Sequence, residues 1–228
     1  MRDRPIARAA RPADISLDVV LCTPRGRQFG ILLVPAPARA RHEWVLPGTP
    51  YPAGEELDAL ADRAATAALG RSPAWLTQVG TFADGKRNPA HPHLTVGYVG
   101  VTPARTGNLP AGARWFSEAE LPLLLPRQLA LVDAALASLR ERMDTAPVAF
   151  RLLAPVFTLG ELQSTYELLL GRRLHKASFR RSLQAAFLVS PTDDWRSEGR
   201  GRPAQLFRFA PRRRRGGRRA VRFELLGG

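Results

Sequence analysis

The sequence predicts an α+β protein of two domains, on three observations. The chain has 228 residues, of which 45% are apolar and 24% charged, which is ordinary for a globular protein and long for one small domain. Strand and helix patterns alternate over its first 146 residues. The remainder is strongly basic: residues 147–228 carry 17 basic and 6 acidic side chains, a net charge of +11, against +3 for residues 1–146.

The first domain is expected to combine a sheet with two helices. Alternating or continuous apolar runs predict strands over residues 15–22, 28–34 and 93–101, with a turn at 24–26. Apolar residues at helical spacing predict helices over residues 55–69 and 126–143. Gly70 should end the first helix. The expected buried stripes are Leu57, Leu60, Ala64 and Ala68 in the first helix, and Leu129, Val132, Leu136, Leu139 and Met143 in the second.

The second domain is expected to run as helix, tight turn, basic helix and hairpin. Thr158 and Glu161 form a capping box, which predicts a helix start, and Gly171 predicts its end. A second helix is predicted over residues 175–187, and strands over 188–190 and 204–209. This order is typical of a winged helix-turn-helix. The alternative is a generic helical domain whose arginines are only solvated.

The charge distribution and the cysteine content indicate where the domains divide and which cellular compartment the protein occupies. The expected division is a flexible N-terminus at 1–14, a first domain at 15–146, a second at 147–211 and a basic disordered tail at 212–228. The one cysteine, Cys22, excludes an intrachain disulfide and fits the cytoplasm. No run of about 18 apolar residues predicts a membrane span. The basic second half is typical of a protein that binds a polyanion such as nucleic acid.

The helix over residues 55–69 carries an incomplete metal-binding pattern. The order of Gly48, an acid-rich helix start and Gly70 resembles the Nudix box, in which glutamates on one helical face hold Mg²⁺ against a pyrophosphate. Counting back from Gly70 places Arg63 at the arginine position and Glu55 at the outer glutamate position, with Gly48 displaced by one residue. The three metal-binding glutamates are replaced: Ala64, Ala67 and Ala68 stand in their places.

Alanine cannot ligate a metal, so we expect no Mg²⁺ cofactor and assign no catalytic residue. The remaining acids, Glu55, Glu56, Asp58 and Asp62, are those favoured in a first helical turn by the helix dipole. The alternative is a relocated metal site built from them.

Further motifs extend the resemblance over about residues 15–209. They are residues 81–87, 93–98, 113–116, 157–162, 174–183 and 201–209, in this order. The most specific are the Phe-Arg-Arg run at 179–181 and the Gly-Arg-Pro run at 201–203. Together they resemble the Nudix-related transcriptional regulators of the NrtR family. The resemblance implies a Nudix-like α/β/α sandwich that senses ADP-ribose or a relative, a DNA-binding winged helix, and a homodimer. His175, where a capping acid is usual, and the arginine-rich tail depart from the family.

The basic helix is the expected recognition helix, with Phe179, Leu183 and Phe187 facing the core. Residues 198–203 would form the wing. Candidate DNA-binding residues are Arg172, Arg173, Lys176, Ser178, Arg180, Arg181, Arg200 and Arg202. One arginine would read a guanine and the others would contact phosphates. Two alternatives stay open: an ion pair of Arg202 with Asp193 or Asp194, and either core packing or base stacking for Phe207 and Phe209.

Candidate nucleotide contacts in the first domain are Trp44, Arg63, Lys86 and Arg87, although Trp44 could equally be core. The sequence thus predicts a cytoplasmic transcriptional regulator that binds duplex DNA and an NAD-related nucleotide, without enzymatic activity. One alternative is an active hydrolase of nucleoside diphosphate derivatives with an accessory basic domain. Another is a nonspecific polyanion binder driven by the tail.

Overall fold

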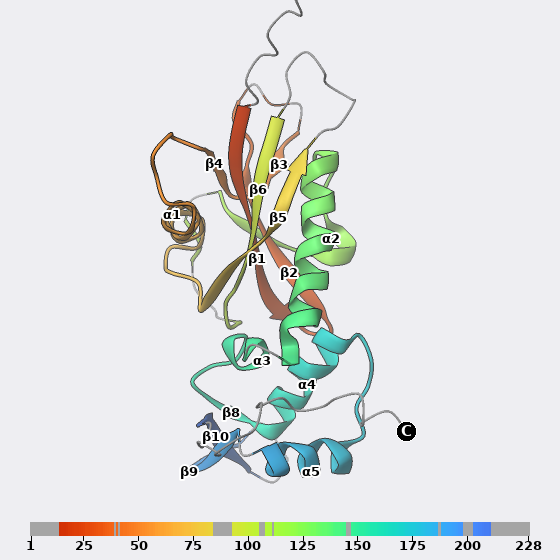
Figure 1. The fold of residues 1–228 in the computed structure, drawn as a ribbon. Coiled ribbons are helices and arrows are strands. Elements are labelled where there is room, and N and C mark those ends of the chain that lie inside the picture. Colours follow the sequence, from red (N-terminus) through yellow and green to blue (C-terminus); the bar gives the residue numbers. More distant parts are fainter. Residues whose placement is uncertain are drawn as a thin grey trace, which may run out of the picture.

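The computed structural model describes residues 14–38, 40, 42–83, 93–104, 108–110, 112–144, 147–186, 188–197 and 203–210. The larger domain contains β1 (Asp14–Arg25), β2 (Gln28–Pro35), β3 (Trp44–Val45), β4 (Gly48–Pro50), α1 (Leu57–Leu69), β5 (Trp75–Ala83), β6 (His93–Val101), β7 (Arg114–Ser117), the 3-10 helix η2 (Glu118–Glu120) and α2 (Pro126–Glu141). The smaller domain lies at one end of this sheet, below it in Figure 1.

The sheet of the larger domain is built around β1. Its strand order is β3-β2-β1-β6-β5, with β4 also paired to β1 and β7 to β2. β1 runs parallel to β6 from Asp14↔His93 to Cys22↔Val101, whereas its pairs with β2 and β4 are antiparallel. The predicted hairpin turn is confirmed, with Gly26 at a φ of 62°. The predicted third strand at residues 93–101 is confirmed as β6.

Alternate residues of β1 face the two sides of the sheet. Leu17, Val19 and Leu21 pack against α1, whereas Val20 and Cys22 belong to the core that contains the buried residues of α2. Figure 1 shows α1 and α2 on opposite sides of the strands. Gly70 ends α1 at a φ of 75°, as expected. The predicted α/β/α sandwich is confirmed.

The smaller domain contains α3 (Val148–Arg151), β8 (Val156–Thr158), α4 (Leu159–Leu170), α5 (Lys176–Ala186), β9 (Val189–Arg196) and β10 (Ala204–Phe209). The predicted capping box is present: Glu161 N–H donates to Thr158 Oγ1 at 3.1 Å, and Thr158 N–H donates to Glu161 Oε2 at 2.6 Å. The three strands form an antiparallel sheet in the order β8-β10-β9. Helix, turn, helix and hairpin follow one another as expected, which confirms the winged helix-turn-helix.

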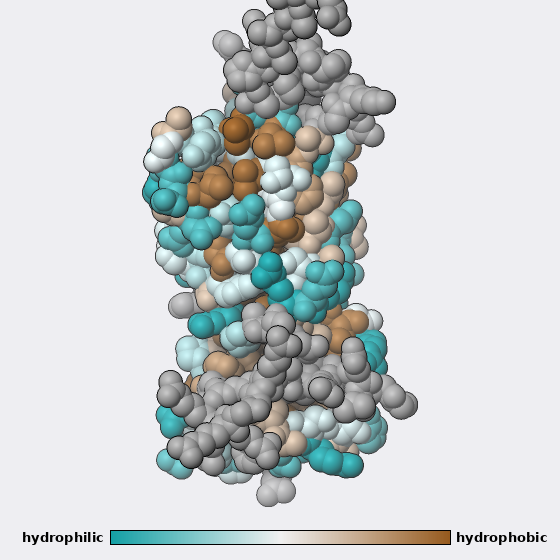
Figure 2. All heavy atoms as spheres, viewed as in Figure 1, coloured by the Kyte–Doolittle hydropathy of each residue, from teal (hydrophilic) through white to brown (hydrophobic). Residues whose placement is uncertain are grey.

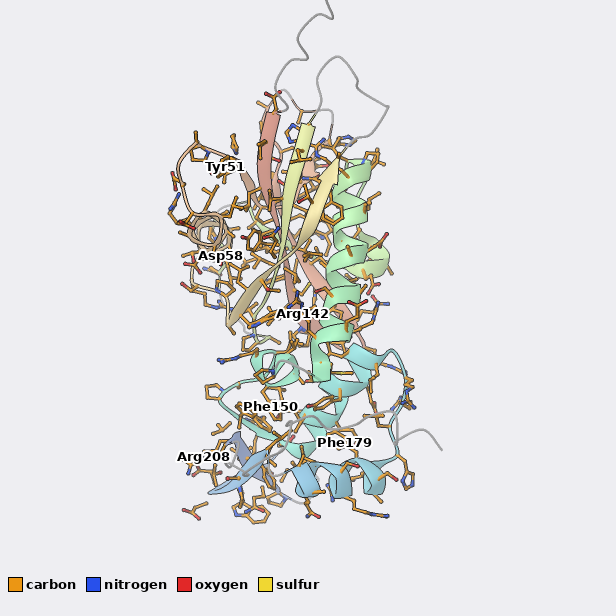
Figure 3. All side chains as sticks on the ribbon, viewed as in Figure 1. Tyr51, Asp58, Arg142, Phe150, Phe179 and Arg208 are labelled. Carbon is orange, nitrogen blue, oxygen red and sulfur yellow. The ribbon has the colours of Figure 1, made fainter. Side chains whose placement is uncertain are left out.

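One core cluster runs through both domains. It joins Cys22 and Val101 at the ends of β1 and β6 to Val148 and Phe150 of α3, and continues to Phe179 of α5. Figure 3 shows Phe150 and Phe179 inside the smaller domain. The smaller domain is therefore packed against the end of the sheet as well as joined to it by the chain.

Three expectations about elements need correction. The second helix ends at Glu141 and passes into the 3-10 helix η3 (Arg142–Asp144), so it does not reach Met143 as α-helix. Leu129 is 39% exposed, because the face of α2 that packs on the sheet centres on Leu131 and Ala135. β9 is eight residues long, since pairing with β10 extends it through a polar stretch that was expected to be loop.

The domain boundaries stay predictions. β1 already includes Asp14, and residues 1–13 and the predicted tail at 212–228 lie outside the described residues. In the described part of the chain, no helix combines the length and apolarity needed to cross a membrane.

Candidate functional site

A pocket of about 520 Å³ lies between α1 and the strands β2 and β4. It is lined by Val34, Pro47, Gly48, Thr49, Pro52, Glu55, Leu60, Arg63, Ala64, Ala67 and Ala68. Its size is typical of small-molecule sites. On the face seen in Figure 2, apolar residues gather over the strands beside α1, among hydrophilic surroundings. The structure therefore brings Glu55, Arg63 and the three alanines of the incomplete Nudix box into one pocket.

The charged groups of this pocket are one guanidinium and one carboxylate. Arg63 Nη2 donates to Glu55 Oε2, and both side chains are partly exposed. A ligand phosphate that reached Arg63 would compete with Glu55 for the same N–H groups. The pocket is thus able to exchange an internal ion pair for a bond to an anionic ligand.

The residues of this pocket do not fit a magnesium site. The three positions that would supply carboxylates present the methyl groups of Ala64, Ala67 and Ala68. Glu55 is paired with Arg63, and Asp58 Oδ1 accepts a hydrogen bond from Tyr98 Oη at 2.6 Å. Figure 3 places Asp58 on α1. Among the described residues, no three His, Cys, Asp or Glu side chains are grouped so as to hold a metal ion. We therefore derive no chemical step through a metal.

The displaced glycine of the box has a structural explanation. A Cβ on Gly48 would lie 2.6 Å from the Leu17 backbone oxygen and would also overlap Asp18 Oδ1. Gly48 pairs with Asp18 in the β1–β4 ladder. Only glycine fits this close approach of β4 to β1, at one edge of the pocket.

Trp44 takes part in a packed aromatic pair. Its ring meets the Phe116 ring edge to face at 5.0 Å, and both rings pack against the core that includes α2. It is not among the residues that line the pocket beside α1. This placement favours the core alternative for Trp44. The other two candidate nucleotide contacts, Lys86 and Arg87, lie outside the described residues.

A buried polar pair lies on the α2 side of the sheet. Gln128 Nε2 donates to Asp18 Oδ2 at 3.3 Å, and both side chains are buried. Burial raises the pKa of Asp18, and the hydrogen bond from Gln128 and the nearby charges of Arg127 and His93 only partly oppose this rise. Within the described part of the chain, Gln128 Oε1 has no hydrogen-bond donor.

In the smaller domain, α5 has one buried and one basic face. Phe179 and Leu183 are buried, which confirms their predicted role, while Lys176, Arg180 and Arg181 are exposed. Ser178 is half-buried, and its Oγ lies 3.3 Å from His175 Nδ1 just before the helix. His175 thus contacts a side-chain hydroxyl, whereas a capping acid would accept from a backbone N–H. Phe187 lies outside the described residues.

Arg172 and Arg173 lie in the turn between α4 and α5, and both are exposed. With Arg27 of the β1–β2 turn and Glu167 of α4, they line a pocket of about 330 Å³ at the domain junction. Burial alone would raise the pKa of Glu167. Hydrogen bonds from the Leu174 N–H and the Gln163 amide, with the charges of Arg173 and Arg27, outweigh burial and lower it. The DNA contact of both arginines stays a prediction.

The wing is supported by β9 and β10, and two residues there were missed by the sequence analysis. Arg196 Nη1 donates to Glu161 Oε1 at 2.8 Å, which ties β9 to the start of α4. Trp195 is 59% exposed on the same strand. Residues 161 and 196 are too far apart in the sequence for any local pattern to predict that they interact. The candidate DNA contacts Arg200 and Arg202, and the proposed ion pair of Arg202, lie outside the described residues.

The two aromatic residues of β10 are half-buried. The Phe209 ring lies 4.3 Å from the Phe150 ring, at an angle of 31°, and Phe207 packs against the same core. This packing favours the core alternative over base stacking for both side chains.

The fold and the two surfaces define a class of protein. A sandwich with a ligand-sized pocket, joined to a winged helix with an exposed basic helix, is the construction of a ligand-responsive nucleic-acid-binding regulator. Residues 149–209 match the sequence model of the NrtR DNA-binding winged helix domain. The chain is 32% identical to the ADPR responsive transcriptional repressor NtrR of Acinetobacter baylyi over 180 residues, 73% of this chain and 70% of the relative. It belongs to this family of Nudix-related transcriptional regulators.

Solved structures agree with this assignment. The crystal structure of Shewanella oneidensis NrtR complexed with a 27mer DNA matches with a TM-score of 0.74 and 28% identity, covering 86% of this chain and 94% of that chain. A MutT/nudix family protein from Enterococcus faecalis matches with a TM-score of 0.66 and 16% identity, covering 88% and 89%, and shares the fold. The family resemblance stated from the sequence motifs is confirmed.

Proposed function

We propose that this chain is a sequence-specific DNA-binding transcriptional regulator whose Nudix-like domain binds ADP-ribose or a related NAD-derived nucleotide without hydrolysing it. The observation that carries the proposal is the pocket beside α1, which keeps Arg63 and a ligand-sized volume but has alanines where metal-binding carboxylates would stand. The relative from Acinetobacter baylyi, named as responsive to ADPR, supports the choice of ligand.

The pocket favours binding over turnover for a chemical reason. Cleavage of a pyrophosphate in a Nudix enzyme depends on metal ions that neutralise charge and activate water. Here the pocket is lined by the methyl groups of the alanines at positions 64, 67 and 68, and the one acid that lines it, Glu55, is paired with Arg63. An arginine can still bind a phosphate through two parallel N–H groups. Arg63 would therefore leave Glu55 and bind the ligand's diphosphate.

The exposed face of α5 is the proposed reader of the DNA sequence. Lys176, Arg180 and Arg181 are exposed along the helix, whereas Phe179 and Leu183 are buried. A helix of this kind fits the major groove, where one arginine on a guanine contributes about 1–3 kcal/mol of discrimination.

The regulator is proposed to act in the cytoplasm as a homodimer that binds two half-sites. A ligand beside α1 would change the relative placement of the two winged helices. The shared core from β1 and β6 into α3 gives this change a route, because the two domains cannot move independently without disturbing it. A coupling of about 1–3 kcal/mol between ligand and DNA is enough for regulation.

A mobility-shift assay with the promoter region of the chain's own gene tests the proposal. We expect binding to this DNA but not to scrambled DNA of the same length, and a change in affinity on adding ADP-ribose. Arg63→Gln should remove the response to ADP-ribose and leave DNA binding unchanged, whereas Arg140→Gln, on the exposed face of α2, should change neither the response nor DNA binding. Equal binding to both DNAs would instead support the nonspecific polyanion binder.

A second assay separates sensing from hydrolysis. The chain is incubated with ADP-ribose and Mg²⁺ or Mn²⁺, and AMP is measured. We expect no turnover above about 0.1 s⁻¹, which is below the usual range of enzymes. Faster, metal-dependent release of AMP would favour the hydrolase alternative.

A further inference from the structure

A second pocket, of about 440 Å³, lies at the hairpin end of the sheet, where β1 and β6 finish. It is lined by Thr23, Pro24, Arg25, Arg71, Pro103, Ala104, Leu109, Ala113, Arg114 and Trp115. It shares no lining residue with the pocket beside α1. The proposed sensor function does not use it.

This second pocket is cationic. Arg25, Arg71 and Arg114 line it, and no Asp or Glu is among its lining residues. Within the described ranges, none of these three arginines forms an ion pair with a carboxylate. The Arg25 and Arg71 guanidinium groups repel each other unless an anion joins them.

Each guanidinium is positioned by a neutral group. Arg25 Nη1 donates to the Trp115 backbone oxygen at 3.0 Å, and Arg71 Nη2 donates to Thr102 Oγ1 at 3.0 Å. The Arg114 guanidinium instead lies 5.0 Å from the centre of the Phe116 ring, on the α2 side of the sheet, so Arg114 is not counted among the ligand's contacts. A guanidinium has five N–H donors, so these contacts orient the groups and leave donors for a ligand.

Thr23 adds an independent observation. Its side chain is only 5% exposed, and in the described part of the chain its Oγ1 is buried without a hydrogen-bond partner. A buried hydroxyl in this state is costly to the fold and usually has an explanation, such as a ligand that completes its hydrogen bonds. Because Thr23 lines the pocket, a molecule bound there can supply that partner.

We propose that this pocket is a second ligand site, for a small phosphate-bearing molecule. Arg25 and Arg71 bind the phosphate oxygens, and the Thr23 hydroxyl donates to one of them. The half-buried Trp115 and Leu109 suit the remainder of the molecule. The site is suited to a small molecule rather than to the backbone of duplex DNA, because the duplex is too broad to bring a phosphate to the buried hydroxyl of a residue that is only 5% exposed.

The position of the pocket connects it to the core that reaches the smaller domain. Thr23 follows Cys22, and Thr102 follows Val101, and both of these neighbours belong to the core that contains Val148 and Phe150 of α3. The Thr102 N–H also donates to the Cys22 oxygen at 3.0 Å. A ligand held between Thr23 and Arg71 therefore lies one residue from the packing that joins the two domains.

Calorimetry of the full chain with inorganic pyrophosphate tests the site. We expect saturable binding that Thr23→Val and Arg71→Gln each weaken by about tenfold or more, since each variant removes a hydrogen bond to a charged group. Arg140→Gln removes the same charge from an exposed position on α2 and should leave the affinity unchanged. Arg63→Gln should leave the Thr23-dependent binding unchanged, and any pyrophosphate that binds beside α1 is the part that Arg63→Gln removes.

Thr23→Val is the sharpest variant because it changes no charge. Its melting temperature should equal or exceed that of the unchanged chain, since it removes an unpaired buried hydroxyl. Pyrophosphate binding that Thr23→Val leaves intact would overturn the proposal, and so would binding that Arg140→Gln weakens equally. Weaker DNA binding by Thr23→Val without pyrophosphate would identify a DNA contact instead and also overturn it. If ADP-ribose displaced pyrophosphate, and if this displacement required Arg63, the proposal would also be overturned.

Discussion

The carboxylate of Glu161 accepts a hydrogen bond from Arg196 at 2.8 Å, and so joins the first turn of α4 to the last residue of β9. The other oxygen of the same carboxylate accepts the Thr158 N–H at 2.6 Å in the capping box. One side chain therefore both starts a helix and fixes the base of the wing. The direction of β9 relative to α4 depends on this contact.

Arg196→Met should loosen the wing with little loss of stability. The pair is partly exposed, at 35% and 40% for the two side chains, so its loss should lower the free energy of unfolding by less than about 1 kcal/mol. Affinity for operator DNA should fall several-fold, because β9 is no longer tied to the start of α4. Urea unfolding and mobility shifts measure the two quantities. Arg140→Met, on α2, is the control and should change neither.

The capping box and the tie to Arg196 show where sequence analysis succeeds and where it stops. Thr158 and Glu161 are three residues apart, and their interaction follows from helix geometry, so the start of α4 could be predicted. Arg196 is 35 residues from Glu161, and only the folded hairpin brings it there. In the same way, the sequence could place Arg63 and the alanines on one helix but not the strands that complete their pocket.

Which apolar residues are exposed and which polar residues are buried also could not be predicted from the sequence. Leu129 fits the helical period of α2 but lies on its exposed side, since the sheet contacts Leu131 and Ala135 instead. Asp18 interrupts an apolar strand pattern and yet is buried. Periodicity gives the spacing of a buried face, whereas the partner surface decides which residues that face includes.

Asp18→Asn should stabilise the protein at neutral pH. The folded-state pKa of Asp18 is raised by burial, so folding of the ionised form is penalised above the ordinary pKa of an aspartate, and this penalty disappears as the pH falls and the group is protonated. Asparagine carries no charge and can donate to Gln128 Oε1. The gain in melting temperature should be largest near pH 8 and shrink toward pH 4. Asp133→Asn on the exposed face of α2 should show no such trend, and a gain that stayed constant with pH would contradict the assignment.

The exposed arginines of α5 should have separable roles in DNA binding. Arg180→Ala and Arg181→Ala should each weaken operator binding. The variant that loses a base contact should relax the preference at one position by about 1–3 kcal/mol, whereas one that loses a phosphate contact should reduce the salt slope by about 1. Arg173→Ala, at the domain junction, should have the smaller effect. Titrations at several salt concentrations with operator and scrambled DNA distinguish these outcomes.

The basic tail should contribute affinity but no sequence preference. Removing residues 212–228, which carry seven arginines, should flatten the dependence of DNA affinity on salt, because fewer counterions are released on binding. The ratio of affinities for operator and scrambled DNA should stay the same. Loss of that ratio together with the tail would show that the assignment of α5 as recognition helix is wrong.

Restoring carboxylates to α1 should restore metal binding. Residues 64 and 67 lie three apart on one helical face and both line the pocket, so Ala64→Glu with Ala67→Glu places two carboxylates side by side beside Glu55. Ala68 is left unchanged because it is buried. We expect calorimetry to detect Mn²⁺ binding by the double variant, and no such binding by the unchanged chain or by Ala59→Glu, which adds a carboxylate on the exposed face of α1. Equal Mn²⁺ binding by the unchanged chain would mean that its own acids already form a relocated site, and would remove the chemical basis for a non-hydrolysing sensor.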